Sequence, residues 1–297
     1  MSVATVAEHA ISNTNNTSDT DKFESLKPTP LRISTKVITA NMGTPMNLQN
    51  IFDTITQRMI PLWYPGEGIL KMEHDTQIVG QSVRDAFSKR AISDKTFFNQ
   101  STLVIRKATN EAKTEFKEVN VKLFGNGGIQ MTGIPHEGFA KQTLEWVLAE
   151  LKQIHTAADK PLFVQTPELQ KFKVQLINSD YQISYGINRT ALHTILSKTY
   201  GLFSTFESTI YQGVNTKYYY NTSQKGGRPG VCMCAKRCRG QGDGDGPGEC
   251  KKITMSVFQT GKIIITGARE MVQLDEAYQF LNRVLWNHRK DILRSLS

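Results

Sequence analysis

The chain has 297 residues, 39% hydrophobic and 21% charged, which is enough for one large or two small cores. Its 36 Lys and Arg outnumber its 27 Asp and Glu, so the formal net charge is +9, which favours a polyanionic partner without establishing one. It has no run of roughly 18 uninterrupted apolar residues, and residues 1–10 lack a basic segment followed by an apolar one. We therefore expect neither a membrane protein nor a secreted one.

The first 30 residues are polar and poor in large apolar side chains, so they predict a disordered tail that ends at Pro28 and Pro30. A β-rich run follows at 32–40, then a helical pattern near 47–59 and a strand at 102–106. Residues 121–133 indicate a β-hairpin with a glycine turn after Phe124, and an amphipathic helix is expected at roughly 136–155.

The same succession returns further along the chain. A strand is expected at 171–178, a helix at 189–199 and a strand at 213–220. A glycine-rich stretch at 224–248 indicates a loop. A second hairpin at 255–267 and a helix at roughly 270–294 complete the sequence of elements.

The two hairpins match residue by residue, because Phe124 aligns with Phe258 at an offset of 134 residues. We therefore divide the chain into a tail (1–30), a first repeat (31–157) and a second repeat (170–297) with a Cys-rich insertion (224–250). The predicted fold class is α+β: two pseudo-repeats form one curved antiparallel sheet with helices on one face. An ordinary duplicated α+β domain with a solvated or dimerising face remains the alternative.

All the cysteines lie in the insertion, at Cys232, Cys234, Cys238 and Cys250. Four thiols in a glycine-rich loop with almost no apolar residues of its own predict a tetrahedral Zn²⁺ site. Two disulfides or free thiols are the alternatives, and the expected non-secreted location favours zinc.

A catalytic set is not apparent. The six histidines are scattered, the glycine-rich run at 125–128 lies in a hairpin and not before a helix, and the cysteines have no histidine nearby in the sequence. We expect a protein that is not an enzyme.

The hairpins identify a resemblance to the TATA-box-binding protein family. Residues 258–268, with Phe258 and Lys262, are close to the signature of that family's second repeat, and residues 206–217 resemble the run that leads into its third strand. The long insertions, residues 97–106 and the cysteine loop are similar to the divergent versions carried by large DNA viruses. The resemblance covers about 31–296 and implies a saddle with its helices on the convex side.

The resemblance also implies a DNA-binding face and its residues. Apolar rings would enter base steps of the minor groove, basic residues would neutralise phosphates, and small or branched residues would line the sheet. The implied rings are Phe124, Phe258, Tyr211 and, at the fourth position, Phe98 or Phe97. The implied phosphate contacts are Arg106, Lys217 and Lys262, with Lys107 and Lys122 as neighbours. The implied face-lining residues are Val104, Thr132, Ile264 and Thr266.

Two departures from the family pattern weaken the case for TATA specificity. Thr35 and Leu176 occupy the positions of the family's groove-binding asparagines, and Gly128 replaces the hairpin lysine of the first repeat. A relaxed A·T preference or another promoter element is expected, because the minor-groove code is degenerate.

The resemblance finally implies a role and partners. The chain would be a basal initiation factor, monomeric on double-stranded DNA, that recruits a transcription-factor-IIB-like protein and RNA polymerase in a host nucleus or a cytoplasmic viral factory. The alternative is a protein–protein scaffold that kept the fold and lost DNA binding.

Overall fold

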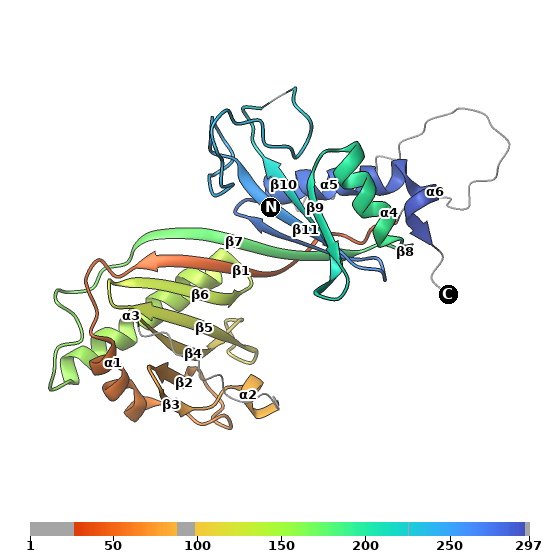
Figure 1. Ribbon diagram of the computed structural model, residues 1–297. Coiled ribbons are helices and arrows are strands. Elements are labelled where there is room, and N and C mark those ends of the chain that lie inside the picture. The colour runs from red at the N-terminus through yellow and green to blue at the C-terminus, as the bar shows by residue number, and fades with distance from the viewer. Residues whose placement is uncertain (1–26, 88–98, 225, 295–297) are drawn as a thin grey trace.

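The computed structural model describes residues 27–87, 99–224 and 226–294, and the predicted tail (1–30) therefore lies almost wholly outside the described residues. Its dominant feature is one sheet of 11 antiparallel strands (Figure 1). No helix within the described ranges is long and apolar enough to cross a membrane.

The first half runs from β1 to α3. Its elements are β1 (Arg32–Asn41), α1 (Leu48–Ile55) with a 3₁₀ turn at Thr56–Arg58, β2 (Gly68–His74), β3 (Gln77–Gly80), α2 (Val83–Phe87), β4 (Gln100–Ala108), β5 (Phe116–Phe124), β6 (Gly128–Ile134) and α3 (Glu137–Ala157).

The second half repeats this order with a long loop in place of one tight turn. Its elements are β7 (Gln170–Gln182), β8 (Gly186–Ile187), α4 (Arg189–Thr194) with a π turn at Ile195–Thr199, β9 (Phe203–Glu207), β10 (Tyr211–Tyr220), β11 (Lys251–Val257), β12 (Lys262–Ala268), α5 (Met271–Asn287), α6 (Arg289–Ile292) and β13 (Leu293–Arg294).

The strand order shows the duplication directly. It runs β3-β2-β4-β5-β6-β1-β7-β12-β11-β10-β9, so β1 and β7 pair at the centre and each half reads outward in the same order. The strand β3 has no counterpart in the second half and extends the edge of the first. The predicted α+β fold, with two pseudo-repeats sharing one antiparallel sheet, is confirmed.

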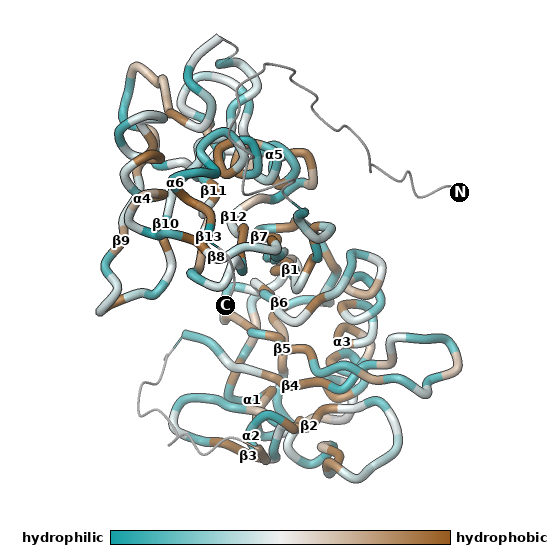
Figure 2. The backbone as a smooth tube through the Cα atoms, turned by 90° about the vertical axis from the view of Figure 1, so that its right-hand side faces the viewer, coloured by the Kyte–Doolittle hydropathy of each residue, from teal (hydrophilic) through white to brown (hydrophobic). Residues whose placement is uncertain are grey.

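Each half has its own core between the sheet and its helices. In the first half Leu103 and Ile105 of β4 pack with Leu144 of α3, and in the second half Ile253 of β11 packs with Leu281 of α5. Side chains alternate between the faces of a strand, so the residues between these buried ones point away from the helices. Figure 2 shows that the strands carry most of the hydrophobic stretches of the chain.

Local signals explain where the helices begin and end. Asn47 and His136 accept hydrogen bonds from backbone N–H groups of the first turns of α1 and α3, which is N-capping. The last predicted helix is interrupted: α5 ends at Asn287 because His288 leaves the helical region at φ −113° and ψ 24°, and the short helix α6 follows.

Candidate nucleic-acid interface

The face of the sheet opposite the helices, which we call the open face, carries most of the predicted contact residues. Val104 and Ile264 each lie between two neighbours that are buried on the helix side, and Thr132 and Thr266 each follow one such residue, so alternation places all four on the open face. Phe124 and Phe258 follow the last core residues of β5 and β11 and point the same way.

Two of the predicted rings form a pair in the second half. The centroids of Tyr211 and Phe258 lie 5.7 Å apart in an edge-on arrangement with an interplanar angle of 63°. Tyr211 is 42% exposed. Gly213 makes the pair possible, since a Cβ there would lie 3.0 Å from the Tyr211 ring and 3.2 Å from the Phe258 ring.

Three lysines lie on the open face of the second half, of which Lys262 is next to the ring pair, because the backbone N–H of Phe258 donates to its carbonyl at 2.9 Å. The Nζ of Lys217 donates to Thr254 Oγ1 at 3.0 Å. Lys252 is two residues before Thr254 on β11 and therefore lies on the same face. Burial first and the charge of Lys252 second lower the pKa of Lys217. A nearby anion would relieve this repulsion. Lys262 is exposed at the first residue of β12.

The centre of the open face has a polar contact that the sequence reasoning missed. Thr266 Oγ1 donates to Asn178 Oδ1 at 2.6 Å, and Asn178 is the register partner of Thr35 across the β1–β7 ladder. Leu176, two residues earlier, pairs with Val37. The second half therefore has an amide side chain at the centre of the open face. It belongs to Asn178, two residues after Leu176, the position that the resemblance assigns to the family's groove-binding asparagine.

The first half departs from this arrangement. Gln100 pairs with Phe124, and its side chain occupies the position that Gly213 leaves empty beside Phe258. Lys122 Nζ lies 3.5 Å from Gln100 Oε1. Phe97 and Phe98 lie outside the described residues.

Arg106 has a role in the structure that the sequence did not suggest. Its Nε donates to the carbonyl of Gly66 and its Nη1 to that of Leu62, both at 2.9 Å, and its Nη2 donates to the carbonyl of Tyr64. In this conformation its donors serve the loop before β2 and not an external phosphate. Lys107 is likewise paired with a carboxylate, that of Glu67.

The cysteines come together as the sequence predicted. Their four Sγ atoms all lie within 4.8 Å of one another, with Cys234–Cys250 at 3.4 Å and Cys250–Cys232 at 3.7 Å, and all four thiols are free. Zn–S bonds of about 2.3 Å in a tetrahedron place sulfurs about 3.8 Å apart, whereas a disulfide requires about 2.05 Å. The spacing suits a metal and not a disulfide.

One of the thiols, that of Cys234, is prepared for deprotonation, whereas burial raises the pKa of Cys232 and of Cys250. Burial acts to raise the pKa of Cys234, but hydrogen bonds from Cys250 and from the backbone N–H of Gly248 outweigh it and lower the pKa to about 7. A thiolate is the form that binds a metal.

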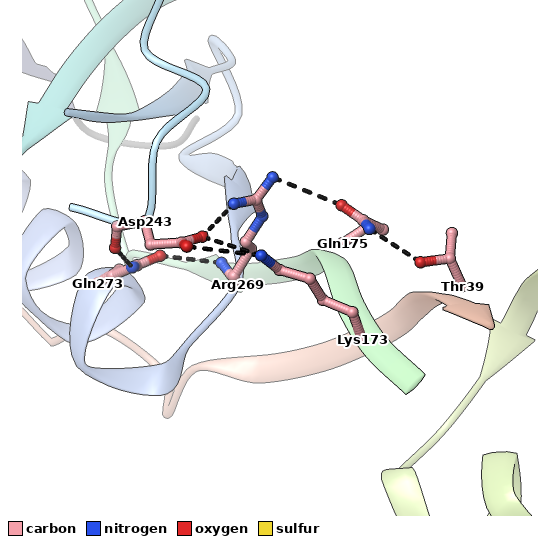
Figure 3. A network of polar contacts seen from close by, with 6 residues as sticks. All are labelled: Thr39, Lys173, Gln175, Asp243, Arg269 and Gln273. Atoms are coloured by element: carbon pink, nitrogen blue, oxygen red, sulfur yellow. Dashed lines mark hydrogen bonds and ion pairs between the residues drawn. The ribbon is translucent and has the colours of Figure 1, made fainter. Parts of the chain in front are cut away.

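A polar network ties the cysteine loop to the sheet (Figure 3). Asp243 of the loop forms ion pairs with Arg269 and, at 3.3 Å, with Lys173. The hydrogen bond from Arg269 is the largest cause of a lowered pKa of Asp243, and it outweighs burial, which acts to raise that pKa. Gln175 Nε2 continues the network by donating to Thr39 Oγ1 at 2.8 Å. The loop is therefore connected to β7 and, through Gln175, to β1 of the first half.

Comparisons with known proteins identify several that are similar to this chain. The family described as "Transcription factor TFIID (or TATA-binding protein, TBP)" matches residues 231–288. A "TATA-box-binding protein-like" protein of Acanthamoeba polyphaga mimivirus is 31% identical over 211 residues, 69% of this chain and 52% of that protein, so the chain spans about half the length of this curated relative. The structure of Methanococcus jannaschii TBP superposes with a TM-score of 0.44 and 14% identity over 86% of this chain and 98% of that one.

Proposed function

Because the chain belongs to the TATA-box-binding protein family, as a divergent member like those of large DNA viruses, we propose that it is a transcription initiation factor that binds promoter DNA in the minor groove and bends it. The family as a whole supports a DNA-binding role in transcription. Minor-groove insertion and bending are our proposal for this chain, and they are how members of this family are known to act.

The observation that carries the proposal is the partly exposed Tyr211–Phe258 pair on the open face, with Lys217 of β10 and Lys252 of β11 further along the same face. A ring that is partly exposed on a sheet can enter a base step, and ammonium groups elsewhere on that face can neutralise phosphates. At the centre, Thr266 donates to the amide oxygen of Asn178, which leaves the Asn178 NH₂ group as a donor for base-edge acceptors. No catalytic role is proposed.

The helical side would recruit the transcription machinery. Met271 and Val272 at the start of α5 are exposed apolar residues on that side, and they suit a protein partner. We propose a transcription-factor-IIB-like protein and RNA polymerase as partners of a monomer on DNA, in the host nucleus or a cytoplasmic viral factory.

The alternative function is a protein–protein scaffold without DNA binding. The contacts of Arg106 favour the scaffold, because a residue predicted to bind phosphate instead donates its hydrogen bonds to carbonyl groups of the same chain. Duplex affinity separates the two functions, since a scaffold has no multi-phosphate salt dependence.

We further propose one structural Zn²⁺ held by Cys232, Cys234, Cys238 and Cys250. The metal would supply the ordering energy that a glycine-rich loop cannot obtain from burial. Elemental analysis of the purified protein is expected to give about one zinc per chain. A well-folded protein that contains no metal would contradict the site.

The test of the main proposal is duplex binding over a salt series, with a duplex labelled at both ends to report bending. Phe258→Ala and Tyr211→Ala are expected to weaken affinity and reduce bending. Phe87→Ala is the control, because that ring is also exposed but lies on α2 of the first half and not in the ring pair of the second. Wild-type protein with no measurable duplex affinity would refute DNA binding.

A further inference from the structure

The two halves of the open face differ at equivalent positions. The hairpins align at an offset of 134 residues, and the strand ladders keep that offset: Lys217 pairs with Thr254, and Val104 pairs with Asn120. The first-half counterpart of Lys217 is therefore Val104, not Arg106.

The other two lysines of the second half also have counterparts in the first half that are not basic. By the same offset, Lys252 corresponds to Glu118, and Lys262 corresponds to Gly128. Three cationic positions become one apolar residue, one carboxylate and one glycine. At these three positions a polyanion would find cations on the second half and a negative charge on the first.

A segment of the chain itself covers the first half. We call residues 60–67 and 81–87, which flank the β2–β3 hairpin, the cover. The first part of the cover accepts the three hydrogen bonds of Arg106. In the second part, the backbone N–H of Val83 donates to Glu118 Oε1 at 2.7 Å, and Asp85 binds Lys71 Nζ at 2.8 Å.

These contacts span three neighbouring strands. Lys71 is on β2, Arg106 on β4 and Glu118 on β5, and Arg106 and Glu118 are direct register partners. Under the cover, Val104 is only 6% exposed although it does not belong to either helix-side core. The open face is thus packed at Val104, whereas its register partner Asn120 on β5 is exposed.

We propose that the duplex is held chiefly by the second half, with a single kink at the Tyr211–Phe258 pair, while the cover closes the outer strands of the first half of the open face. This inference rests on the proposed DNA binding. The part of a sheet face that already holds a packed segment with a carboxylate cannot approach the phosphates of a groove, so one half of the duplication binds DNA over its whole face and the other is closed at its outer strands.

Matched substitutions in the two halves test the proposal. Phe258→Ala is expected to weaken duplex binding at least tenfold, and its counterpart Phe124→Ala less than twofold. In a salt series, Lys252→Ala is expected to reduce the slope of log K against log salt by about 1, whereas Lys122→Ala leaves the slope unchanged. Thermal melts confirm that each variant is folded.

Hydrogen exchange gives an independent measurement on the unaltered chain. Amides of the cover, that of Val83 included, are expected to keep their protection when duplex is added. Equal losses from Phe124→Ala and Phe258→Ala, or deprotection of the cover on DNA binding, would overturn the inference and leave DNA binding intact. Wild-type protein without duplex affinity would overturn the proposed function itself.

Discussion

Gly213 is the position at which a single methyl group best tests the ring pair. In Gly213→Ala the new Cβ would lie 3.0 Å from Tyr211 Cε1 and 3.2 and 3.3 Å from Phe258 Cε1 and Cζ. Carbon atoms prefer separations of about 3.5–4.0 Å, so both rings must move by a few tenths of an ångström. Their relative orientation in the groove then changes.

The cost to folding should be small. Overpacking a closed core costs about 1–3 kcal/mol, but Tyr211 is 42% exposed and can yield into solvent. Replacing a strand glycine by alanine also returns about 0.5–1 kcal/mol of backbone entropy. We therefore expect a net change in unfolding free energy within about 1 kcal/mol of zero.

The cost to DNA binding should be larger. We expect duplex affinity to fall three- to tenfold, which is about 0.7–1.4 kcal/mol, together with a smaller bend in the end-labelled duplex. Gly125→Ala is the control: this glycine follows Phe124, and the nearest atom to its Cβ is Met46 O at 3.8 Å. Unchanged affinity and bending in Gly213→Ala, with unchanged stability, would refute the wedge role of the pair.

Three further variants test other parts of the structure. Cys250→Ser should lower the bound zinc from about one per chain to none and make the loop between β10 and β11 sensitive to protease; full zinc content would contradict the four-sulfur site. Burial acts to raise the pKa of Glu67, but hydrogen bonds from Lys107 and a backbone N–H outweigh it and hold the pKa below its usual value. The ionised Glu67 therefore contributes to the free energy of unfolding above its ordinary pKa, and this contribution is lost as the pH falls through the lowered pKa. Glu67→Gln should accordingly lower stability by about 1–3 kcal/mol near pH 7 and by much less in acid, as measured by denaturant titration at both pH values; an equal loss at both would argue against the ion pair. Tyr218→Phe removes the hydrogen bond to Glu276 at 2.6 Å and should cost about 0.5–1.5 kcal/mol in the same titration, and an unchanged midpoint would show that this bond contributes nothing.

The hairpins were predictable because their signals are local. Alternation and glycine turns place Phe124, Phe258, Thr132 and Thr266 on one face, and the structure agrees. The cysteines were predictable for a similar reason: a short loop with little apolar content keeps four thiols within reach of one ion.

The fate of Arg106 could not be predicted in this way. Its three partners lie 40 to 44 residues earlier, in a loop whose path depends on how the β2–β3 hairpin folds back. A basic residue at a strand end looks the same in sequence whether it faces solvent or a carbonyl. Only the assembled sheet distinguishes the two.

The register between the central strands β1 and β7 also could not be predicted from the sequence. Pairing between β1 and β7 shifts between Val37 and Ile38, opposite Leu176 and Val174, so one extra residue enters β7. Such a bulge changes which side chains share a face. Asn178 and Gly213 become recognisable as site residues only when the ladder is known.

The separation of the two helix-side cores has an evolutionary consequence. Among the described residues Val174 alone packs against both clusters, and the halves otherwise meet along the β1–β7 ladder and a few polar side-chain contacts such as Gln175 to Thr39. An insertion or an exchanged charge in one copy therefore disturbs little of the packing in the other. The two copies of a duplicated unit can therefore diverge in function while each still folds.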